Sequence, residues 1–310
     1  MYLNHFGLSQ APFSLTPNTG FFFGLWPHVE ALQVLQTALQ TGEGFIKVTG
    51  EVGTGKTLIC RKLINELPPG FNCAYLPNPY LSPTELRWAV ANELGLKYSS
   101  DIDQQQLTGL IQQQLLALSA HGHSIVLVLD EAQALPDESL EALRLFTNLE
   151  TENRKLLQVV LFGQPELDER LKLPSFRQLR QRITFSYNLR PLTWDETDAY
   201  ICYRLAVAGC AGAPLFSPKL TRKIADASRG IPRLINILSH KALMLSFGEG
   251  SSHVNAAHVK GAILDTEDAC NQTPFRWSTY VAIALMTLTA MFVALAMWGE
   301  DLRLLWGNSV

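Results

Sequence analysis

Residues 50–57, with the sequence GEVGTGKT, fit the pattern G-x-x-x-x-G-K-[S/T] at every fixed position. This pattern describes a loop between a strand and a helix, and its flanks agree: residues 45–49 are typical of a short strand and residues 58–67 of a helix. The glycines allow backbone conformations in which successive N–H groups point inward, toward phosphate oxygens. The segment therefore predicts an α/β fold that binds a nucleotide. The alternative is a glycine-rich turn that matches by chance.

Most of the predicted nucleotide contacts come from this loop. Lys56 supplies a positive charge for the β- and γ-phosphates, and the hydroxyl of Thr57 suits Mg²⁺. The helix that begins here directs the positive end of its dipole at the anion. We predict ATP and Mg²⁺ as ligands, with these binding residues in the loop: Gly50, Glu51, Val52, Gly53, Thr54, Gly55, Lys56, Thr57 and Leu58.

An unbroken apolar strand, residues 124–129, ends in two carboxylates, Asp130 and Glu131. Such a run is typical of a strand covered on both faces, as in a parallel sheet between helices. Ligands of these sheets gather at the carboxyl ends of the strands. We therefore expect Asp130 to be a partner of Mg²⁺ together with Thr57, and Glu131 to be the general base for the attacking water. The alternative is that the two acids only cap a helix.

A further strand, residues 157–162, leads to Gln164. A polar side chain there would lie between the phosphate loop and the acidic strand. Gln164 is thus predicted to contact the γ-phosphate and the lytic water. The alternative is that Gln164 only starts a turn.

Three arginines, Arg177, Arg180 and Arg182, precede the apolar strand at residues 183–189. The planar guanidinium group suits bidentate binding of phosphate. If subunits pack side by side, one of the three can reach a neighbour's γ-phosphate; the alternative is a solvated basic face. Arg233 lies at a helix start in the helical region that follows, and it can move onto the phosphates when that unit closes.

The N-terminal segment, residues 1–44, contains several helix-breaking residues and an aromatic run. Such a segment often covers the base of a bound nucleotide, so residues 15–18 (LTPN) are a candidate adenine contact. Plain packing is the equal alternative. The net charge of −3 gives no global electrostatic reason to expect nucleic acid as the main partner. The five cysteines are scattered, which indicates reduced thiols and no disulfide frame.

The stretch from residue 277 to residue 298 contains no charged residue. This length matches what a helix needs to cross a bilayer, and tryptophans lie at both ends. We therefore expect one transmembrane helix at 277–298, after a linker at 269–276 and before a short tail at 299–310. The alternative is a buried core helix. The predicted location is the bacterial inner membrane, single-pass, with the ATPase domain in the cytoplasm.

Five segments in this order, GEVGTGKT, LVLDEAQ, LFGQPEL, RQLRQRI and SRGIPRLIN, resemble the ExeA/GspA-like branch of the AAA+ ATPases. The likeness covers about residues 1–270. Within the branch, the chain is most similar to the ATPases of mannose-sensitive haemagglutinin (type IV) pilus biogenesis. The secretion ATPases of the branch carry a large peptidoglycan-binding domain after the span. Because little follows the predicted span here, we expect the pilus type.

The resemblance implies a three-layer αβα P-loop domain with a parallel five-stranded sheet at residues 45–190, and then a helical lid at 191–268. It makes Lys56 and Thr57 the Walker A residues, Asp130 and Glu131 the Walker B pair, and Gln164 sensor 1. It likewise makes Arg233 sensor 2, and Arg180 or Arg182 the arginine finger.

The resemblance also implies ATP hydrolysis and assembly into a ring or dimer, or a hetero-oligomer with other pilus or secretion proteins. The expected role is assembly of an envelope machine, most of all a type IV pilus. The alternatives are a type II secretion assembly ATPase, a DNA-associated regulator of the transposition type, and a scaffold that binds ATP without turnover. The predicted span disfavours the DNA-associated regulator, and Glu131 disfavours the scaffold.

Overall fold

The computed structural model describes residues 2–16, 19–77, 79–99, 101–146, 155–270 and 285–289. Contacts divide the chain into two units, Met1–Ala269 and Cys270–Val310. The first unit contains a sheet with its flanking helices and a helical lid, and it carries every candidate site residue named above.

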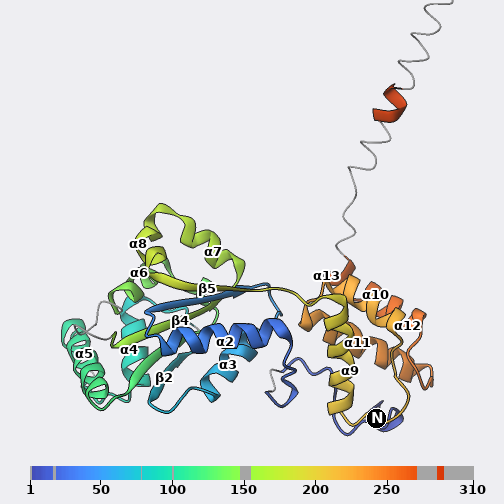
Figure 1. Cartoon of the computed structure of the whole chain (residues 1–310), viewed down its shortest axis with the longest axis horizontal. Helices are drawn as coiled ribbons and strands as arrows, with labels where there is room; N and C mark the ends of the chain where they lie inside the picture. Colours follow the sequence, from blue (N-terminus) through green and yellow to red (C-terminus); the bar gives the residue numbers. More distant parts are fainter. Residues whose placement is uncertain are drawn as a thin grey trace, which may run out of the picture. The chain divides into compact units, whose positions relative to one another are not determined.

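A parallel sheet forms the centre of the first unit (Figure 1). Its strands are β1 (Phe45–Gly50), β2 (Phe71–Leu76), β3 (Ser124–Leu129), β4 (Leu157–Gly163) and β5 (Ile183–Leu189). They lie in the order β2-β3-β4-β1-β5, and every neighbouring pair is parallel. This confirms the predicted five-stranded parallel sheet. Because β4 lies between β1 and β3, the loops after these three strands meet at one edge.

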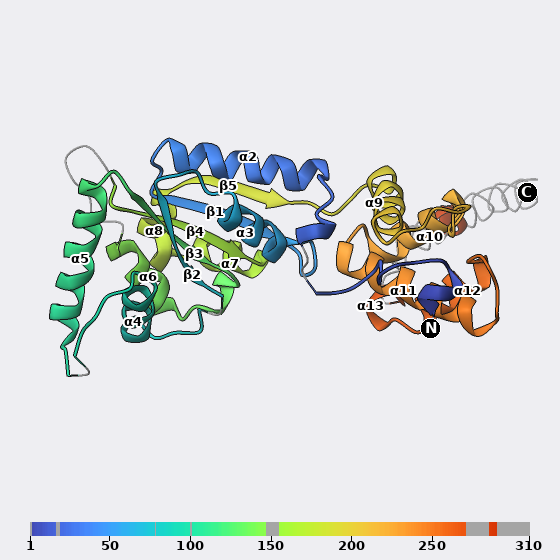
Figure 2. The ribbon, with the colours of Figure 1, turned by 90° about the horizontal axis from the view of Figure 1, so that it is seen from below.

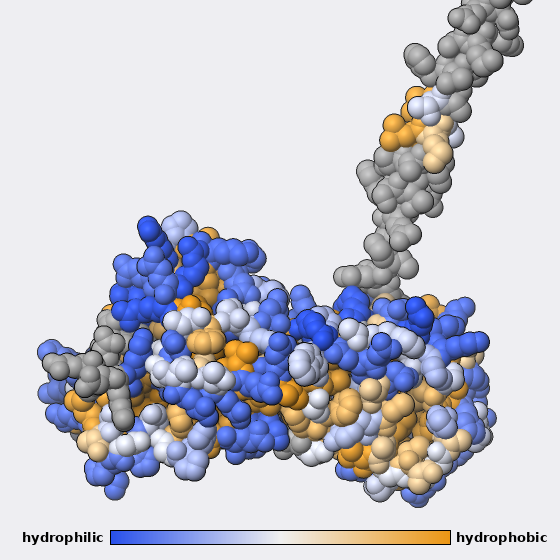
Figure 3. All heavy atoms as spheres, in the orientation of Figure 1, coloured by the Kyte–Doolittle hydropathy of each residue, from blue (hydrophilic) through white to orange (hydrophobic). Residues whose placement is uncertain are grey.

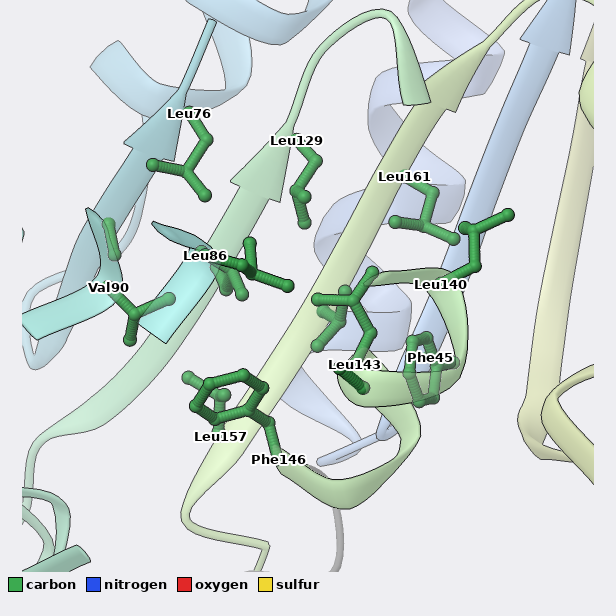
Figure 4. Close-up of a cluster of buried hydrophobic side chains, with 14 of the residues drawn as sticks. Phe45, Leu76, Leu86, Val90, Leu129, Leu140, Leu143, Phe146, Leu157 and Leu161 are labelled. Atoms are coloured by element: carbon green, nitrogen blue, oxygen red, sulfur yellow. The ribbon is translucent and has the colours of Figure 1, made fainter. Parts of the chain in front are cut away.

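Helices cover both faces of the sheet, as the unbroken apolar strands predicted. Along β3, Val126 and Val128 pack with one core, whereas Leu127 and Leu129 pack with another. The first core lies under α2 (Trp26–Gln40) and α3 (Lys56–Asn65), and Figure 2 shows α2 running along the sheet. The second core, shown in part in Figure 4, is shared with these helices: α4 (Pro83–Glu93), α5 (Gln104–Ala120), α6 (Asp137–Phe146), α7 (Pro165–Lys172) and α8 (Arg177–Arg182).

Among the described residues, short 3₁₀ turns connect these elements: η1 (Thr19–Phe21), η2 (Ala132–Ala134) and η3 (Pro174–Phe176). The turn η2 follows the two acids after β3, and the side chain of Glu131 makes no capping hydrogen bond to it. A regular helix resumes only at α6. The acids thus lie at a tight turn at the edge of the sheet.

The helical lid has a hydrophobic core of its own. It consists of α9 (Trp194–Val207), α10 (Pro218–Ser228), α11 (Pro232–Gly248), α12 (Ala256–Leu264) and α13 (Glu267–Cys270). Thr193 caps α9 in a capping box with Glu196, which fixes where the lid starts after β5. Apolar side chains are visible on the lid surface in Figure 3, and Leu264 is among the exposed ones in this domain.

The N-terminal segment divides between the two domains. The short helix α1 (Tyr2–His5) and the residues after it contribute Phe6, Leu8 and Phe13 to the lid core. In contrast, α2 packs on the sheet through residues such as Leu35. The segment before α2 is therefore part of the lid structure, although it lies about 180 residues away in sequence from α9.

The transmembrane helix predicted at residues 277–298 must be corrected. Within the described ranges, no helix has the length and apolar character needed to cross a membrane. Residues 285–289 are the described part of that stretch and form little more than one helical turn, against about 20 residues for a span. The rest of 277–298, most of the predicted linker and the tail at 299–310 lie outside the described residues. The span is removed from the fold class, and the single-pass inner-membrane location that depended on it is withdrawn.

Candidate nucleotide-binding site

A cavity of 350 Å³ lies where the phosphate loop, the acidic edge of the sheet, the lid and the N-terminal segment come together. This volume is in the range of small-molecule sites. The loop contributes Val52, Gly53, Gly55, Lys56, Thr57 and Leu58 to the lining. The sheet edge contributes Glu131 and Gln164, the lid Tyr200, Arg204, Pro232, Arg233 and Asn236, and the N-terminal segment Ser14, Leu15 and Thr16.

Two glycines of the loop have backbone conformations that other residues rarely adopt. Gly53 has φ +83° and Gly55 has φ +103°. A Cβ atom on Gly55 would lie 3.0 Å from Nε2 of His28, and one on Gly53 would lie 2.6 Å from Cβ of Arg233. The glycines thus serve the turn itself and the close approach of α2 and the lid.

His28, a buried residue of α2, contacts the backbone of the loop. Nε2 of His28 lies 2.9 Å from the carbonyl oxygen of Thr54, so this nitrogen carries the proton and donates it. Burial lowers the pKa of His28, which favours the neutral imidazole. The hydroxyl of Thr54 in turn donates to the Glu51 carbonyl oxygen at 2.8 Å. The loop is therefore fixed by His28 of α2 and by its own Thr54 side chain.

Lys56 is buried at the start of α3 and lines the cavity. Its Nζ donates to the carbonyl oxygens of Gly50 at 2.7 Å and Glu51 at 2.9 Å. Burial lowers the pKa of Lys56, and the nearby carboxylates of Glu131 and Asp130 oppose this shift. The ammonium group is thus placed among backbone groups and acids at the cavity, where a phosphate would be its natural counter-charge.

Asp130 is buried behind Thr57. Burial raises the pKa of Asp130, while hydrogen bonds from the Thr57 hydroxyl and the Glu131 N–H act against the rise. The Glu131 N–H donates to Oδ1 of Asp130 at 3.0 Å. A hydroxyl and a carboxylate in contact form a pair of hard oxygen ligands, which is the chemistry that Mg²⁺ takes in nucleotide sites. Thr57 and Asp130 therefore fit the predicted metal.

Glu131 adopts a left-handed backbone conformation, with φ +54°, which is costly for a residue with a side chain. Its Oε2 accepts hydrogen bonds from Nε2 of Gln133 at 2.6 Å and Nε2 of Gln164 at 3.0 Å. Oε1 of Gln133 also accepts from the backbone N–H of Gln164 at 3.0 Å. The two amides fix one carboxylate oxygen of Glu131 at the edge of the cavity.

Gln133 was not among the predicted site residues. It lies only two positions after Glu131, inside the segment LVLDEAQ. The turn η2 directs its side chain back to the carboxylate of Glu131. Its carbonyl oxygen also accepts from Arg170 of α7 at 2.8 Å, and Arg170 pairs with Asp137. The closeness of Gln133 to Glu131 in sequence was the one signal that could have indicated this contact. The geometry of the turn between them could not be predicted from the sequence.

The lid reaches the loop through the first turn of α11. The backbone N–H of Arg233 donates to the Gly53 carbonyl oxygen at 3.1 Å, and the exposed Arg233 side chain lines the cavity. Gly230, just before this helix, has φ +72° and packs directly on the backbone of Leu192. The structure therefore brings Arg233 to the phosphate loop.

Arg204 of α9 joins the N-terminal segment to the lid. It is buried, and it donates to the carbonyl oxygens of Pro12 at 2.5 Å and Ser14 at 3.2 Å. It also donates to the Tyr200 hydroxyl at 3.1 Å, and its guanidinium lies 4.4 Å from the ring centre of Phe21. Sequence reasoning missed Arg204 and Tyr200, because nothing local links them to residues almost 200 positions earlier.

The hydrogen bonds of Arg204 to Pro12 and Ser14 hold the segment next to the candidate adenine contact, residues 15–18. Leu15 and Thr16 line the cavity, whereas Pro17 and Asn18 lie outside the described residues.

The arginines of α8 do not line this cavity. Arg180 donates to the Lys172 carbonyl oxygen at 3.1 Å, and Arg182 lies 3.5 Å from the Arg144 carbonyl oxygen. Arg177 is exposed at the start of the helix. Within one chain, none of the three is brought to the phosphate loop.

Comparisons with known proteins agree with this arrangement. Residues 39–171 match a family model described as AAA domain. The chain is 43% identical over 299 residues to the general secretion pathway protein A of Aeromonas hydrophila. That similarity covers 96% of this chain but 54% of the relative, so the chain spans about half the length of the curated protein that it matches.

Solved structures show the same fold. The Cdc6p protein of Pyrobaculum aerophilum matches with a TM-score of 0.63 and 20% identity, over 82% of this chain and 70% of that one. The ORC2 protein of Aeropyrum pernix matches with a TM-score of 0.59 and 16% identity, over 83% and 74%. The RuvB motor of Thermotoga maritima matches with a TM-score of 0.55 and 18% identity, over 81% and 73%.

The special likeness to the ATPases of mannose-sensitive haemagglutinin pilus biogenesis is not shown by these comparisons. The chain is thus similar to an AAA domain over residues 39–171 and to the secretion pathway protein over 96% of its own length.

Proposed function

We propose that this chain hydrolyses ATP and that the hydrolysis serves the general secretion pathway, that is, type II secretion. The observation that carries the ATPase assignment is the common cavity of Lys56, Glu131 and Gln164. The similarity to the secretion pathway protein supports the process served. This is the alternative that the sequence resemblance left open, and no comparison supports the pilus role that was expected first.

Binding of the triphosphate is assigned to the loop and the start of α3. The positive φ angles of Gly53 and Gly55 shape a turn whose N–H groups can face an anion, with the helix dipole behind it. Lys56 exchanges its two carbonyl partners for phosphate oxygens. The remaining loop residues, Gly50, Glu51, Val52, Thr54 and Leu58, keep the turn in shape or line its rim.

Activation of water is assigned to Glu131. The carboxylate accepts the proton of a water that attacks the γ-phosphorus, while the bond from that phosphorus to the bridging oxygen breaks and ADP leaves. Gln133 and Gln164 fix the orientation of the carboxylate. Gln164 is bonded to the acid and lines the cavity, so it can also bond the γ-phosphate. Mg²⁺, held by Thr57 and Asp130, would neutralise charge on the phosphates.

Completion of the site is assigned to a second copy of the chain. Arg180 or Arg182 would supply a positive charge to the neighbour's γ-phosphate, since neither lines the cavity of its own chain. The surface around α7 and α8 is predominantly hydrophilic in Figure 3, in agreement with a polar contact. The test replaces Arg177, Arg180 and Arg182 by alanine, one at a time. The arginine finger is the residue whose replacement lowers the hydrolysis rate without weakening ATP binding.

The test of catalysis is the variant Glu131→Gln. It keeps a side chain of the same shape but removes the base, so we expect hydrolysis to fall at least about a hundredfold while ATP affinity stays within about twofold. Phosphate release and equilibrium binding measure the two quantities on the same preparation. Retained hydrolysis in Glu131→Gln would remove Glu131 from the catalytic role.

The test of the process is made in the cell. The native gene is replaced by the Glu131→Gln form, and secreted proteins and surface pili are quantified in parallel. We expect secretion to fall and pili to be unaffected. A loss of pili with normal secretion would restore the pilus role, and salt-sensitive binding of the purified chain to duplex DNA would favour the DNA-associated regulator.

A further inference from the structure

Five buried side-chain polar atoms have no hydrogen-bond partner within the described part of the chain. Three of them belong to lid helices α9 and α11: Oγ1 of Thr197, Oδ1 of Asn236 and Oγ of Ser239. Of these three, only Asn236 lines the cavity. The residue is 6% exposed, so the amide is almost completely enclosed by the protein.

An enclosed amide oxygen without a partner costs free energy, because water no longer satisfies it. The cost is recovered if a ligand in the adjoining cavity supplies a donor. An amide also has a donor of its own, and the assignment of its oxygen and nitrogen can exchange by a flip. The group that fits is therefore one that presents a donor and an acceptor side by side.

Asn236 is separated from the phosphate loop along α11. Arg233 is at the phosphate loop, bonded through its N–H to Gly53. Asn236 follows three residues later, so it is about one turn, or about 5 Å, further along the helix. Tyr200 and Leu15, which line the same cavity, provide aromatic and apolar surface for a flat ring.

We propose that Asn236 recognises the adenine base of the bound nucleotide. This rests on the proposed function. Its amide oxygen accepts from the 6-amino group, and its amide nitrogen donates to N7, the pairing that asparagine makes with adenine edges. Guanine and hypoxanthine present two acceptors at the same edge, O6 and N7, so the amide oxygen would face a second acceptor. Asn236 thus determines the preference for ATP.

The test compares dissociation constants of four nucleotides, ATP, GTP, ITP and 2′-deoxy-ATP, for the full chain and for Asn236→Leu. Leucine has nearly the shape of asparagine but no polar atoms. Ser239→Ala is the matched control, since Ser239 is also a buried residue of α11 with an unpartnered oxygen but does not line the cavity.

We expect the native chain to bind ATP at least about tenfold more tightly than GTP or ITP. In Asn236→Leu this ratio should fall to near one because ATP binds more weakly. The ratio of ATP to 2′-deoxy-ATP should not change, and Ser239→Ala should keep all ratios. Asn236→Ala provides the same comparison if the leucine variant fails to fold.

Three results would overturn the proposal. A preference for ATP that persists in the folded variant removes Asn236 from base recognition. A changed ratio of ATP to 2′-deoxy-ATP would place the amide at the ribose. A folded native chain that binds none of the four nucleotides would refute the proposed function, and the base assignment with it. The first two results would refute only the base assignment and leave the proposed function intact.

Discussion

The two ends of the cavity are built in different ways. The phosphate end is made mainly from one continuous turn, residues 50–57, with the acids after β3 and Gln164 after β4 at the same sheet edge. The other end is made from the N-terminal segment and the lid, which Arg204 joins by bonds to Pro12 and Ser14. The first end is centred on one local segment, whereas the second depends entirely on contacts between parts of the chain that are far apart in sequence.

This difference has a physical reason. Phosphate is a charged group of fixed shape, so it needs particular backbone angles and a particular cation at fixed spacing, and one short segment can supply them. A base is flat and weakly polar, and many combinations of apolar surface and single polar groups can hold it. The two ends should therefore respond differently to substitution.

Loss of the Arg204 side chain should have the largest effect, and it should act on stability. Arg204→Leu leaves the Pro12 and Ser14 carbonyl oxygens and the Tyr200 hydroxyl without their donor, at a cost of about 1–3 kcal/mol for each that stays unsatisfied. We expect the free energy of unfolding to fall by about 2–4 kcal/mol. Urea unfolding measures this value.

Arg222→Leu is the control for that variant. Arg222 is an exposed arginine of the same lid, and its guanidinium lies over the Trp194 ring at 5.2 Å. We expect a change within about 1 kcal/mol. Equal losses in the two variants would mean that Arg204 does not join the segment to the lid.

Loss of the Lys56 ammonium group should act on binding. Lys56→Ala removes the cation at the phosphate end, and hydrogen bonds to charged groups contribute about 1.5–3 kcal/mol. We therefore expect ATP affinity to fall about 10- to 150-fold, as titration calorimetry would show. Lys62→Ala is the control on the same helix, because Lys62 pairs with Glu66 and does not line the cavity. An equal effect of both changes would argue against a specific phosphate contact.

Loss of the Gln133 amide should act on the rate. Gln133→Leu frees Oε2 of Glu131 from one of its two donors, so we expect the hydrolysis rate to fall about tenfold with ATP affinity unchanged. Gln164→Leu should have a similar effect. Because both amides bond the same oxygen, the double variant should depart from the sum of the two changes. Strict additivity would show that the amides act independently.

The smallest effect concerns the ion pair at the start of the lid. Arg190 lowers the pKa of Glu196 to about 2 through a bidentate hydrogen bond, and the Thr193 N–H adds to this. The folded state therefore favours the ionised acid. This contribution is present above the unfolded pKa of about 4.3 and is lost as the pH falls toward 2.

Because Arg190 is 45% exposed, we expect this contribution to be no more than about 1 kcal/mol. Unfolding of Glu196→Gln between pH 2 and pH 7 measures it. The variant should match the native chain at pH 2 and be less stable at pH 7. A difference that is the same at both values would exclude the ionised pair as the cause.

What the sequence could predict follows the same division. The sheet, the loop and the acids were readable, because the alternation of strand and helix and the spacing of residues 50–57 are local patterns. The contacts of Gln133 and Arg204 and the proposed role of Asn236 were not predictable, since they depend on one tight turn and on contacts across the chain. The apolar stretch at 277–298 was interpreted from its length, its lack of charge and the tryptophans at its ends, and no helix of sufficient length is found in the described residues.

The central claim is that loop, acids and lid surround one nucleotide, and Arg233 tests it most directly. The measurement is the dissociation constant of MgATP for the native chain and for Arg233→Ala. We predict a single site in the native chain and at least about tenfold weaker binding in the variant, because a charge-assisted contact from the lid is lost. Equal affinity of the two folded proteins for MgATP would contradict the account.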